Sequence, residues 1–291
     1  MYHNLQQLYE QAQERKESLW KVVLQNEQDH TGMSETAVYA GLRQRYEIMC
    51  SSAGRAIQTD ELSGAGTLIT GLAKQHDAYG KEKGGLCGGF LNQVMARALS
   101  CSEVNAAMGR ICAAPTAGAC GVLPAVLLSI AERWELETQM VLEGLLTASG
   151  VGAVIMKNGT VSGAEGGCQA ECGAAAAMAA AAAVYLCGGT NRQQLDAAAF
   201  ALSNAMGLIC DPVAGLVQVP CAQRNASQAV NALLSADMAL GGMTAVIPVD
   251  EVIEAMYQTG KMLPAALKET AMGGLAATKT GQKLKKNLGV N

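Results

Sequence analysis

The sequence predicts an all-α protein: a single compact helical domain over residues 1–291 with a buried, alanine- and glycine-rich helix at its centre. Aromatic residues make up only 4% of the chain, whereas glycine and methionine number 33 and 14. Strands favour aromatic and β-branched side chains, while small and flexible side chains suit closely packed helices. The longest apolar run, residues 173–187, is shorter than the about 20 residues that cross a bilayer. We therefore expect it to be the core helix, and expect no membrane partner.

The first half of the chain divides into helices by its apolar spacing and its helix-start residues. Residues 3–29 are expected to form one polar, amphipathic N-terminal helix, within an N-terminal part spanning 1–30. Ser34 is a suitable N-cap for a second helix to about Ser52. Glycines interrupt the stretch 64–89, which contains His76. Further helices are expected over 90–108, from about 122 onward, and over 137–156.

Two turn-rich segments contain candidates for substrate binding. In AAPTAGACGVLP, residues 113–124, glycines allow close backbone approach to a ligand, and the N-terminus of the following helix would attract an anion. Thr116 and Gly118 are therefore candidates to hold a carboxylate, although they also fit an ordinary turn. The Asn-Gly pair predicts a turn over 157–160 that contains Lys157 and Asn158.

The next segment has a recognisable helix start. Ser162 followed three residues later by Glu165 fits a capping box, which predicts a helix over about 163–186 that ends at the glycine pair 188–189. Cys168 then lies within the first two turns of this helix. Ser162 and Glu165 are candidates for helix capping and equally for substrate contact, and Asn158 is a further candidate for substrate contact.

Two more cysteines follow similar signals. A helix over about 191–206 stops at Gly207 and is followed by a loop that contains Cys210. Pro220 suits the first turn of the next helix, which places Cys221 at a helix N-terminus. The positive end of a helix dipole lowers a thiol pKa, so Cys221, and Cys168 more weakly, are expected to favour the thiolate. Three thiolates, Cys168, Cys210 and Cys221, suit a metal cluster that keeps one iron open to a substrate oxygen.

Composition excludes several other classes of protein. Ten cysteines in 291 residues are too few for a secreted disulfide scaffold, and the start of the chain has no apolar signal segment. We therefore expect a cytoplasmic protein with reduced thiols. A net charge of −4 disfavours nucleic acid as a partner, and we expect the basic stretch within 279–291 to be a flexible, solvated tail.

Three segments resemble the α chain of the iron-sulfur-dependent L-serine dehydratases. They are VNAAMGRICAAPTAGACGVLPAVL at 104–127, KNGTVSGAEGGCQAECGAAAAMAAA at 157–181 and LICDPVAGLVQVPCAQRNA at 208–226, and the match extends over nearly the whole chain. In that family three cysteines separated by 42 and then 11 residues bind a 4Fe-4S cluster, and Cys168, Cys210 and Cys221 have both separations. The resemblance implies β-elimination of water from L-serine without pyridoxal phosphate. The aminoacrylate formed then hydrolyses to pyruvate and ammonia.

The resemblance also implies a partner. Single-chain members of the family carry a β region with a Ser-Ser-Ser-His-Thr-x-Gly-Pro segment, which this sequence does not contain. It therefore resembles the two-subunit form, whose β chain is a separate protein, so a heterotetramer or a homo-oligomer is expected. In such an enzyme the open iron would polarise the substrate C–OH bond, while Lys157 or a β-chain histidine removes the α-proton.

Two alternative functions fit the same residues. The cysteines would also serve a non-catalytic iron-sulfur or zinc protein, although a structural zinc site needs four ligands and only Cys172 is near enough in sequence to suggest the fourth. A cluster-dependent hydratase of another hydroxy acid is the second alternative, because the loops rather than the cluster select the substrate. Cys172 does not fit the family spacing. Packing is the expected role of the remaining six cysteines, which are Cys50, Cys87, Cys101, Cys112, Cys120 and Cys187.

Overall fold

The fold is helical throughout the part of the chain that the structure describes. This computed structural model describes residues 2–59, 62 and 67–289, and in these ranges it has thirteen α-helices, short 3-10 and π turns, and no strand. The predicted all-α fold is confirmed.

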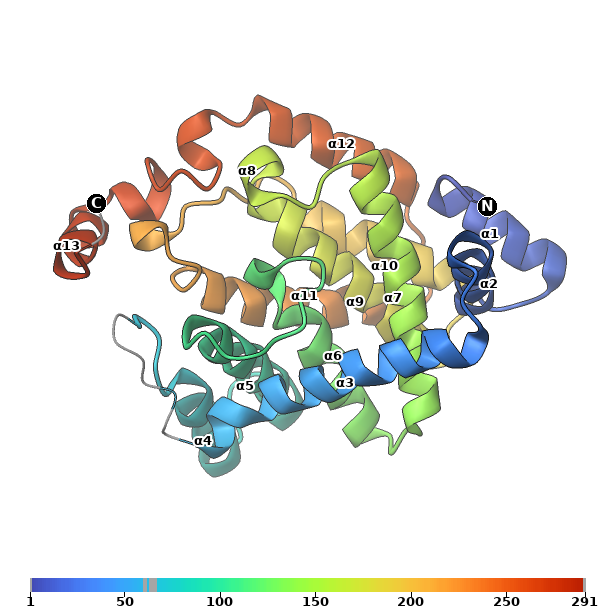
Figure 1. Ribbon diagram of the computed structural model, residues 1–291, viewed down its shortest axis with the longest axis horizontal. Coiled ribbons are helices and arrows are strands. Elements are labelled where there is room, and N and C mark those ends of the chain that lie inside the picture. Colours follow the sequence, from blue (N-terminus) through green and yellow to red (C-terminus); the bar gives the residue numbers. More distant parts are fainter. Residues whose placement is uncertain (1, 60–61, 63–66, 290–291) are drawn as a thin grey trace.

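Turns and loops connect the α-helices along the chain, and the two end helices are far apart. In chain order the helices are α1 (Leu5–Arg15), α2 (Leu19–Thr31), α3 (Glu35–Gln58), α4 (Leu72–Lys83), α5 (Gly88–Ala106), α6 (Val122–Arg133), α7 (Thr138–Asn158), α8 (Gly163–Gly166), α9 (Ala174–Leu186), α10 (Asn191–Ala205), α11 (Cys221–Leu240), α12 (Val249–Met262) and α13 (Lys279–Asn287). Helices α1 and α13 lie at opposite ends of the longest axis (Figure 1).

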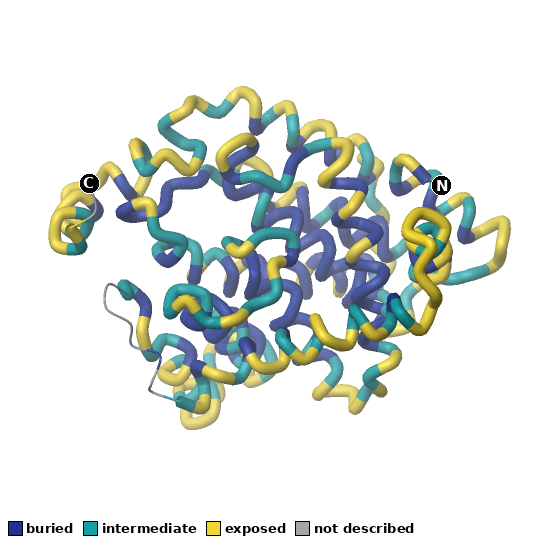
Figure 2. The backbone as a smooth tube through the Cα atoms, in the orientation of Figure 1, coloured by how far each residue is buried: buried dark blue, intermediate teal, exposed yellow. Residues whose placement is uncertain are grey.

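Helix α9 is the centre of the core, as the alanine run predicts. Every residue of α9 except Tyr185 is buried, and the helix packs against α6, α7, α10 and α11. Figure 2 shows this central region in the colour of buried residues, with the exposed residues around it. Alanine is the best helix former, and a helix that is apolar on all sides is stable only when neighbours surround it. The small side chains let those neighbours approach closely.

Two stretches are long and apolar enough to cross a membrane by length and composition alone, namely Thr138–Asn158 and Gln169–Leu186. Their most apolar windows are 67% and 89% buried within the protein itself. Helices at the centre of a folded core have this same character.

The N-terminal part consists of two helices, so the prediction of one helix over 3–29 is wrong. Lys16 ends α1 in the left-handed conformation, with φ 54°, and Ser18 precedes α2. The start of α1 is fastened to α12, because the Asp250 carboxylate accepts hydrogen bonds of 2.9 Å from the backbone N–H groups of Leu5 and Gln6. A carboxylate at this position satisfies the free donors of the helix N-terminus.

Other helix boundaries differ from the sequence prediction in both directions. The Ser34 N-cap is confirmed, with its hydroxyl accepting a 3.2 Å hydrogen bond from Ala37 N–H, but α3 continues past Ser52 to Gln58. The stretch predicted to be interrupted by glycines contains the regular helix α4. The C-terminal segment, predicted as a flexible tail, forms the helix α13 as far as Asn287.

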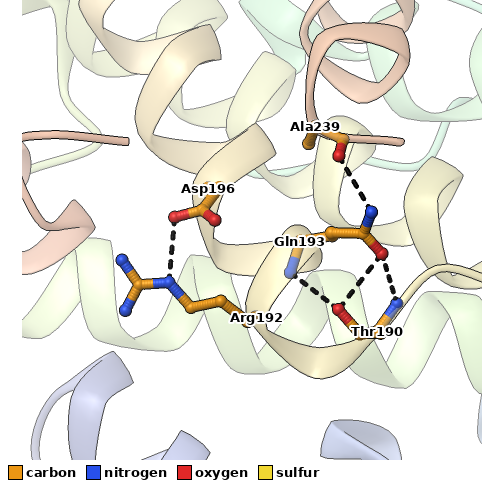
Figure 3. A network of polar contacts seen from close by, with 5 residues as sticks. All are labelled: Thr190, Arg192, Gln193, Asp196 and Ala239. Atoms are coloured by element: carbon orange, nitrogen blue, oxygen red, sulfur yellow. Dashed lines mark hydrogen bonds and ion pairs between the residues drawn. The ribbon is translucent and has the colours of Figure 1, made fainter. Parts of the chain in front are cut away.

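A polar network joins the start of α10 to the end of α11 (Figure 3). Thr190 and Gln193 form a capping box, and the Gln193 side-chain amide donates a 2.9 Å hydrogen bond to the carbonyl of Ala239. Beside it, Arg192 pairs with Asp196 at 3.1 Å. The bond from Gln193 to Ala239 connects the two helices, while the other contacts order the first turn of α10. The opposite end of α10 leads to Cys210, and α11 begins at Cys221.

Candidate functional site

A break in the chain just before α9 shapes the site. The helix predicted over 163–186 is interrupted at Gly167, where φ is +77°, and a π turn over Gln169–Gly173 connects to α9. A Cβ on Gly167 would lie 2.9 Å from the Leu208 carbonyl oxygen, so this close approach requires glycine. Turns of the π type are frequent at functional sites. The break places Cys168 directly before the π turn and Glu171 inside it.

The predicted capping box of Ser162 and Glu165 does not form. The Ser162 side chain makes no capping hydrogen bond, and Glu165 Oε2 accepts a 2.5 Å hydrogen bond from Thr160 Oγ1. The backbone of the first turn does form, with Gly166 N–H donating a 2.9 Å hydrogen bond to the Ser162 carbonyl, but the Glu165 carboxylate is engaged by Thr160 instead of the N-cap. Glu165 is exposed to solvent.

The structure brings Cys168, Cys210 and Cys221 into one group. Cys168 and Cys210 are buried, Cys221 is half-buried, and each of the three thiols interacts electrostatically with the others. Residues from three places in the sequence therefore converge where the chain enters α9, leaves α10 and enters α11. A group of three thiols is a donor set that iron–sulfur clusters and zinc both use.

The segment after α12 holds Cys210 from the other side. Cys210 N–H donates a 2.9 Å hydrogen bond to the Leu267 carbonyl, and Glu269 N–H donates a 2.8 Å hydrogen bond to the Cys210 carbonyl. These two bonds form an isolated parallel bridge centred on Lys268. Cys210 is therefore fixed by its backbone, while its thiol remains free to contact a ligand.

Two carboxylates lie beside this thiol. Oxygen atoms of Glu171 and Glu269 and the Cys210 sulfur all lie within 4.8 Å of one another. Glu171 accepts a 2.9 Å hydrogen bond from Thr116 Oγ1, and a Cβ on Gly118 would lie 3.2 Å from Glu171 Oε1. The predicted substrate-binding residues Thr116 and Gly118 are thus close to the cysteine group. Burial raises the pKa of Glu171 to about 7, with a smaller contribution from Glu269, while the Thr116 hydrogen bond opposes the shift.

A buried ion pair supports the opposite side of the group. Arg224 pairs with Asp211 at 2.7 Å and donates a 2.8 Å hydrogen bond to the Ile209 carbonyl. Its guanidinium also lowers the pKa of the Cys168 thiol. The second Asp211 oxygen accepts a 2.7 Å hydrogen bond from Leu275 N–H. Arg224 therefore places a positive charge beside the Cys168 thiol. Through Ile209 and Asp211 it also contacts the loop on both sides of Cys210.

The loop that contains Thr116 and Gly118 is tied directly to α11. The Asn225 side-chain amide donates hydrogen bonds of 2.7 and 2.8 Å to the carbonyls of Gly118 and Cys221. Its oxygen accepts a 2.8 Å hydrogen bond from Gly121 N–H. One buried amide therefore fixes the distance between the predicted substrate loop and the cysteine group.

The expected preference of Cys221 for the thiolate is wrong in direction. Burial, together with the nearby Cys168 and Glu171, raises the pKa of Cys221 to about 12. Burial and the same negative neighbours also raise the pKa of Cys210. Loss of hydration outweighs the helix N-terminus here. A bound metal ion reverses this preference, because a coordinating thiol loses its proton.

Cys168 differs from the other two thiols. Its pKa is lowered, first by a hydrogen bond from the Cys172 thiol and further by Arg224, against the opposing effect of burial. The direction matches the expectation from the sequence, but the cause is these two side chains rather than a helix N-terminus. Cys172 is buried behind Cys168 as its hydrogen-bond donor.

Lys157 and Asn158 contact His3 rather than the cysteine group. They belong to the last turn of α7, so the predicted turn starts only at Gly159. Lys157 Nζ is 2.8 Å from His3 Nδ1, and Asn158 Nδ2 donates a 2.9 Å hydrogen bond to the His3 carbonyl. Both side chains lie toward the surface, and within the described ranges neither makes a polar contact with the cysteine group.

Sequence reasoning missed the charged residues of the site. Glu171 and Arg224 each follow a cysteine of the group, Cys168 and Cys221 respectively, by three residues, which places them one helical turn away. This three-residue spacing could have indicated Glu171 and Arg224 as site residues from the sequence alone. Glu269 carries no such signal, because only the folding of the segment after α12 brings it to Cys210.

Comparison with known proteins identifies the family of this chain. The family model described as serine dehydratase alpha chain matches residues 14–276. This chain belongs to the serine dehydratase alpha-chain family. It is 42% identical over 287 residues to the L-serine dehydratase alpha chain of Peptoniphilus asaccharolyticus, and the match covers 99% of this chain and 98% of that one. It is 41% identical over 288 residues to a probable L-serine dehydratase alpha chain of Bacillus subtilis, with 99% and 95% covered.

One longer relative matches this chain over only part of its own length. An L-serine dehydratase of Helicobacter pylori is 34% identical over 284 residues, which is 95% of this chain but 62% of that protein. The serine dehydratase alpha-chain family therefore includes this chain together with relatives of similar length named alpha chain. In the longer relative, the matching region is only one part of the protein.

Proposed function

We propose that this chain is the catalytic α chain of an L-serine dehydratase. The reaction removes the α-proton and the β-hydroxyl of L-serine as water, and the resulting aminoacrylate hydrolyses to pyruvate and ammonia. One observation carries the proposal: three thiols with the family spacing converge beside Glu171 and the Thr116 loop, in a chain of this family.

The proposed cofactor is a 4Fe-4S cluster bound by Cys168, Cys210 and Cys221. When bound, the cluster would supply a Lewis-acidic iron with an open position that polarises the bond to the leaving hydroxyl. The donor set fits such a cluster, because buried thiols with raised pKa values need a cation to stabilise their thiolates. The ten cysteines form no disulfide among the described residues, in keeping with the cytoplasmic location that we propose.

The chain's own residues orient the site. Arg224 and Asp211 fix the loop that carries Cys210, and Asn225 holds the Thr116 loop against α11. Thr116 directs one oxygen of Glu171 and leaves the other toward Gly163 and Cys210. Such fixed polar groups reduce the reorganisation needed when charge develops on the substrate.

The α-proton needs a base that this chain does not clearly supply. His3 contacts Lys157 at the surface, and the only other histidines of the sequence are His30 and His76, which belong to α2 and α4. We therefore propose that a β chain supplies an imidazole, with Lys157 as the alternative base. The relatives named alpha chain are in keeping with a separate β chain.

The segment after α12 is the proposed contact with the β chain. It carries Glu269 and exposes Met272 and Leu275, and together with Met262, the last residue of α12, it presents three large apolar side chains, of which Met262 and Met272 are 76% and 71% exposed. Permanent interfaces are rich in such residues. A partner that covers them would also close the site from solvent.

The proposal is tested by anaerobic reconstitution of the chain with iron and sulfide, with and without a purified β chain. Pyruvate is then measured with L-serine, D-serine and L-threonine. We expect pyruvate from L-serine when both chains are present and little from the α chain alone. A chain that binds iron but forms no pyruvate with either composition would support the non-catalytic iron-sulfur alternative. Full activity without the β chain would point to Lys157 or another residue of this chain as the base.

A further inference from the structure

The carboxylates of Glu171 and Glu269 form a close pair that is joined by no basic side chain of the described residues. Their oxygens and the Cys210 sulfur lie within 4.8 Å of one another. Across the ranges 2–59, 62 and 67–289, no basic side chain forms an ion pair with either carboxylate. Arg224, the nearby cation, is paired with Asp211. Glu171 is half-buried and Glu269 is exposed, and two carboxylates this close repel one another, so a positive charge that joins them is favourable.

The Cys210 thiol is a second sign that a ligand binds at this point. Cys210 is only 4% exposed, and its sulfur makes no hydrogen bond to any described residue, although it faces both carboxylates. Its position is fixed by the backbone bonds to Leu267 and Glu269. A buried polar atom without a partner calls for a ligand, which for this sulfur is the proposed cluster, and the two anions beside it, paired with no basic side chain, would attract a cationic group to the same point.

We infer that Glu171 and Glu269 together bind the α-ammonium group of the substrate. This inference rests on the proposed function and extends it, since it explains why the site would accept an amino acid. L-Serine carries one ammonium group that can donate to both carboxylates. A hydroxy acid lacks that group, and a dicarboxylic hydroxy acid would bring an additional negative charge toward the pair.

The arrangement of the pair suits this role. Thr116 holds Glu171 Oε1, so the remaining oxygen is directed toward Gly163 and Cys210. Glu269 lies on the loop whose backbone pairs with Cys210, so its carboxylate is carried next to the Cys210 thiol. The ammonium and hydroxyl groups of serine are on adjacent carbons. The carboxylates can therefore bind the ammonium group while the neighbouring C–OH bond is polarised, without a large movement of the substrate.

The test uses the reconstituted complex of α and β chains with the variants Glu171→Gln and Glu269→Gln. The matched control is Glu254→Gln, an exposed glutamate on α12. We measure the KM for L-serine, the iron content, and the calorimetric Kd values of L-alanine and L-lactate. These two ligands differ in their amine and hydroxyl groups, and neither carries a β-hydroxyl to eliminate.

Each site variant is expected to raise the KM for L-serine and the Kd of L-alanine about tenfold or more, the usual range for a lost hydrogen bond to a charged group. The Kd of L-lactate and the iron content should stay close to those of the Glu254→Gln control. Equal weakening of both ligands, or unchanged binding of L-alanine, would overturn the inference. Loss of iron would do so too, because the carboxylates would then be cluster ligands. A wild-type complex that makes no pyruvate refutes the proposed function, while the contrast between L-alanine and L-lactate still decides this inference.

Discussion

Two groups of buried cysteines in this molecule have very different surroundings. Cys101 and Cys120 lie in a small apolar cluster with Ala53, where the Cys101 sulfur is 3.5 Å from the Ser52 hydroxyl and Cys120 donates to the Cys101 carbonyl at 3.8 Å. Their pKa values are raised mainly by burial. In the group of Cys168, Cys210 and Cys221 the first two are buried and Cys221 is half-buried, and this group is surrounded by charged side chains.

The comparison of the two groups shows that burial alone does not identify a functional cysteine. Burial raises the pKa of Cys101 to about 12, and it raises that of Cys221 to about 12 as well, so neither the burial nor the pKa distinguishes a packing thiol from a ligand. The difference is in the neighbours, which are a serine and alanine in one group and Arg224, Glu171 and Glu269 in the other. Arg224 and Glu171 are partly buried, and charged groups are costly to bury, so a protein retains them where a charged ligand compensates.

The largest expected effect comes from removing the thiols of the charged group. Cys168→Ala, Cys210→Ala or Cys221→Ala should each abolish the visible absorbance of the reconstituted cluster and pyruvate formation, because each removes one of three ligands. Cys101→Ala and Cys120→Ala are the matched controls and should retain both. Absorbance spectra and iron analysis provide the measurement. A control variant that lost its cluster while remaining folded would remove the distinction between the two groups.

The next largest effect is expected from removing Arg224, a charge that lies beside the group of Cys168, Cys210 and Cys221 and has no counterpart beside Cys101 and Cys120. Arg224→Met leaves the Asp211 carboxylate, which is 2% exposed, without its cationic partner. Breaking a buried ion pair on one side costs about 3 to 5 kcal/mol, so we expect a loss of this size in the free energy of unfolding, measured by chemical denaturation. The double variant Arg224→Met with Asp211→Asn should recover part of it. Lys81→Met, in an exposed ion pair with Asp77, should change stability by less than about 1 kcal/mol.

A smaller effect is expected from crowding the carboxylates rather than removing them. A Cβ on Gly163 would lie 2.7 Å from Glu171 Oε2 and 3.2 Å from the Cys210 sulfur, so Gly163→Ala must displace the Glu171 side chain. We expect kcat/KM for L-serine to fall about tenfold, since small displacements of binding groups carry large kinetic costs. Gly89→Ala, whose Cβ would meet nothing within 4 Å, is the control. Equal kinetics of the two variants would show that Glu171 has no role in the reaction.

The sequence predicts the core more completely than the site. Helix α9 follows from its alanine run and the glycines after it, because local propensity and burial agree there. The division between α1 and α2 has no comparable signal, since Lys16 adopts a left-handed conformation that its residue type does not favour. The three cysteines are predictable from their spacing. The pair of Glu171 and Glu269 is not, because it exists only once the segment after α12 folds against Cys210.

The smallest effect is expected at the fourth cysteine beside the charged group. Cys172 is 1% exposed and hydrogen-bonds Cys168, which makes it the neighbour of a ligand rather than part of the set with the family spacing. Cys172→Ala removes one buried sulfur and should lower the free energy of unfolding by about 1 kcal/mol. Loss of its hydrogen bond raises the pKa of Cys168, but a coordinating metal displaces that proton in any case. The cluster absorbance and iron content of Cys172→Ala should therefore equal those of the Cys120→Ala control. If Cys172→Ala alone lost the cluster, Cys172 would be a ligand and the open position that substrate binding requires would be filled.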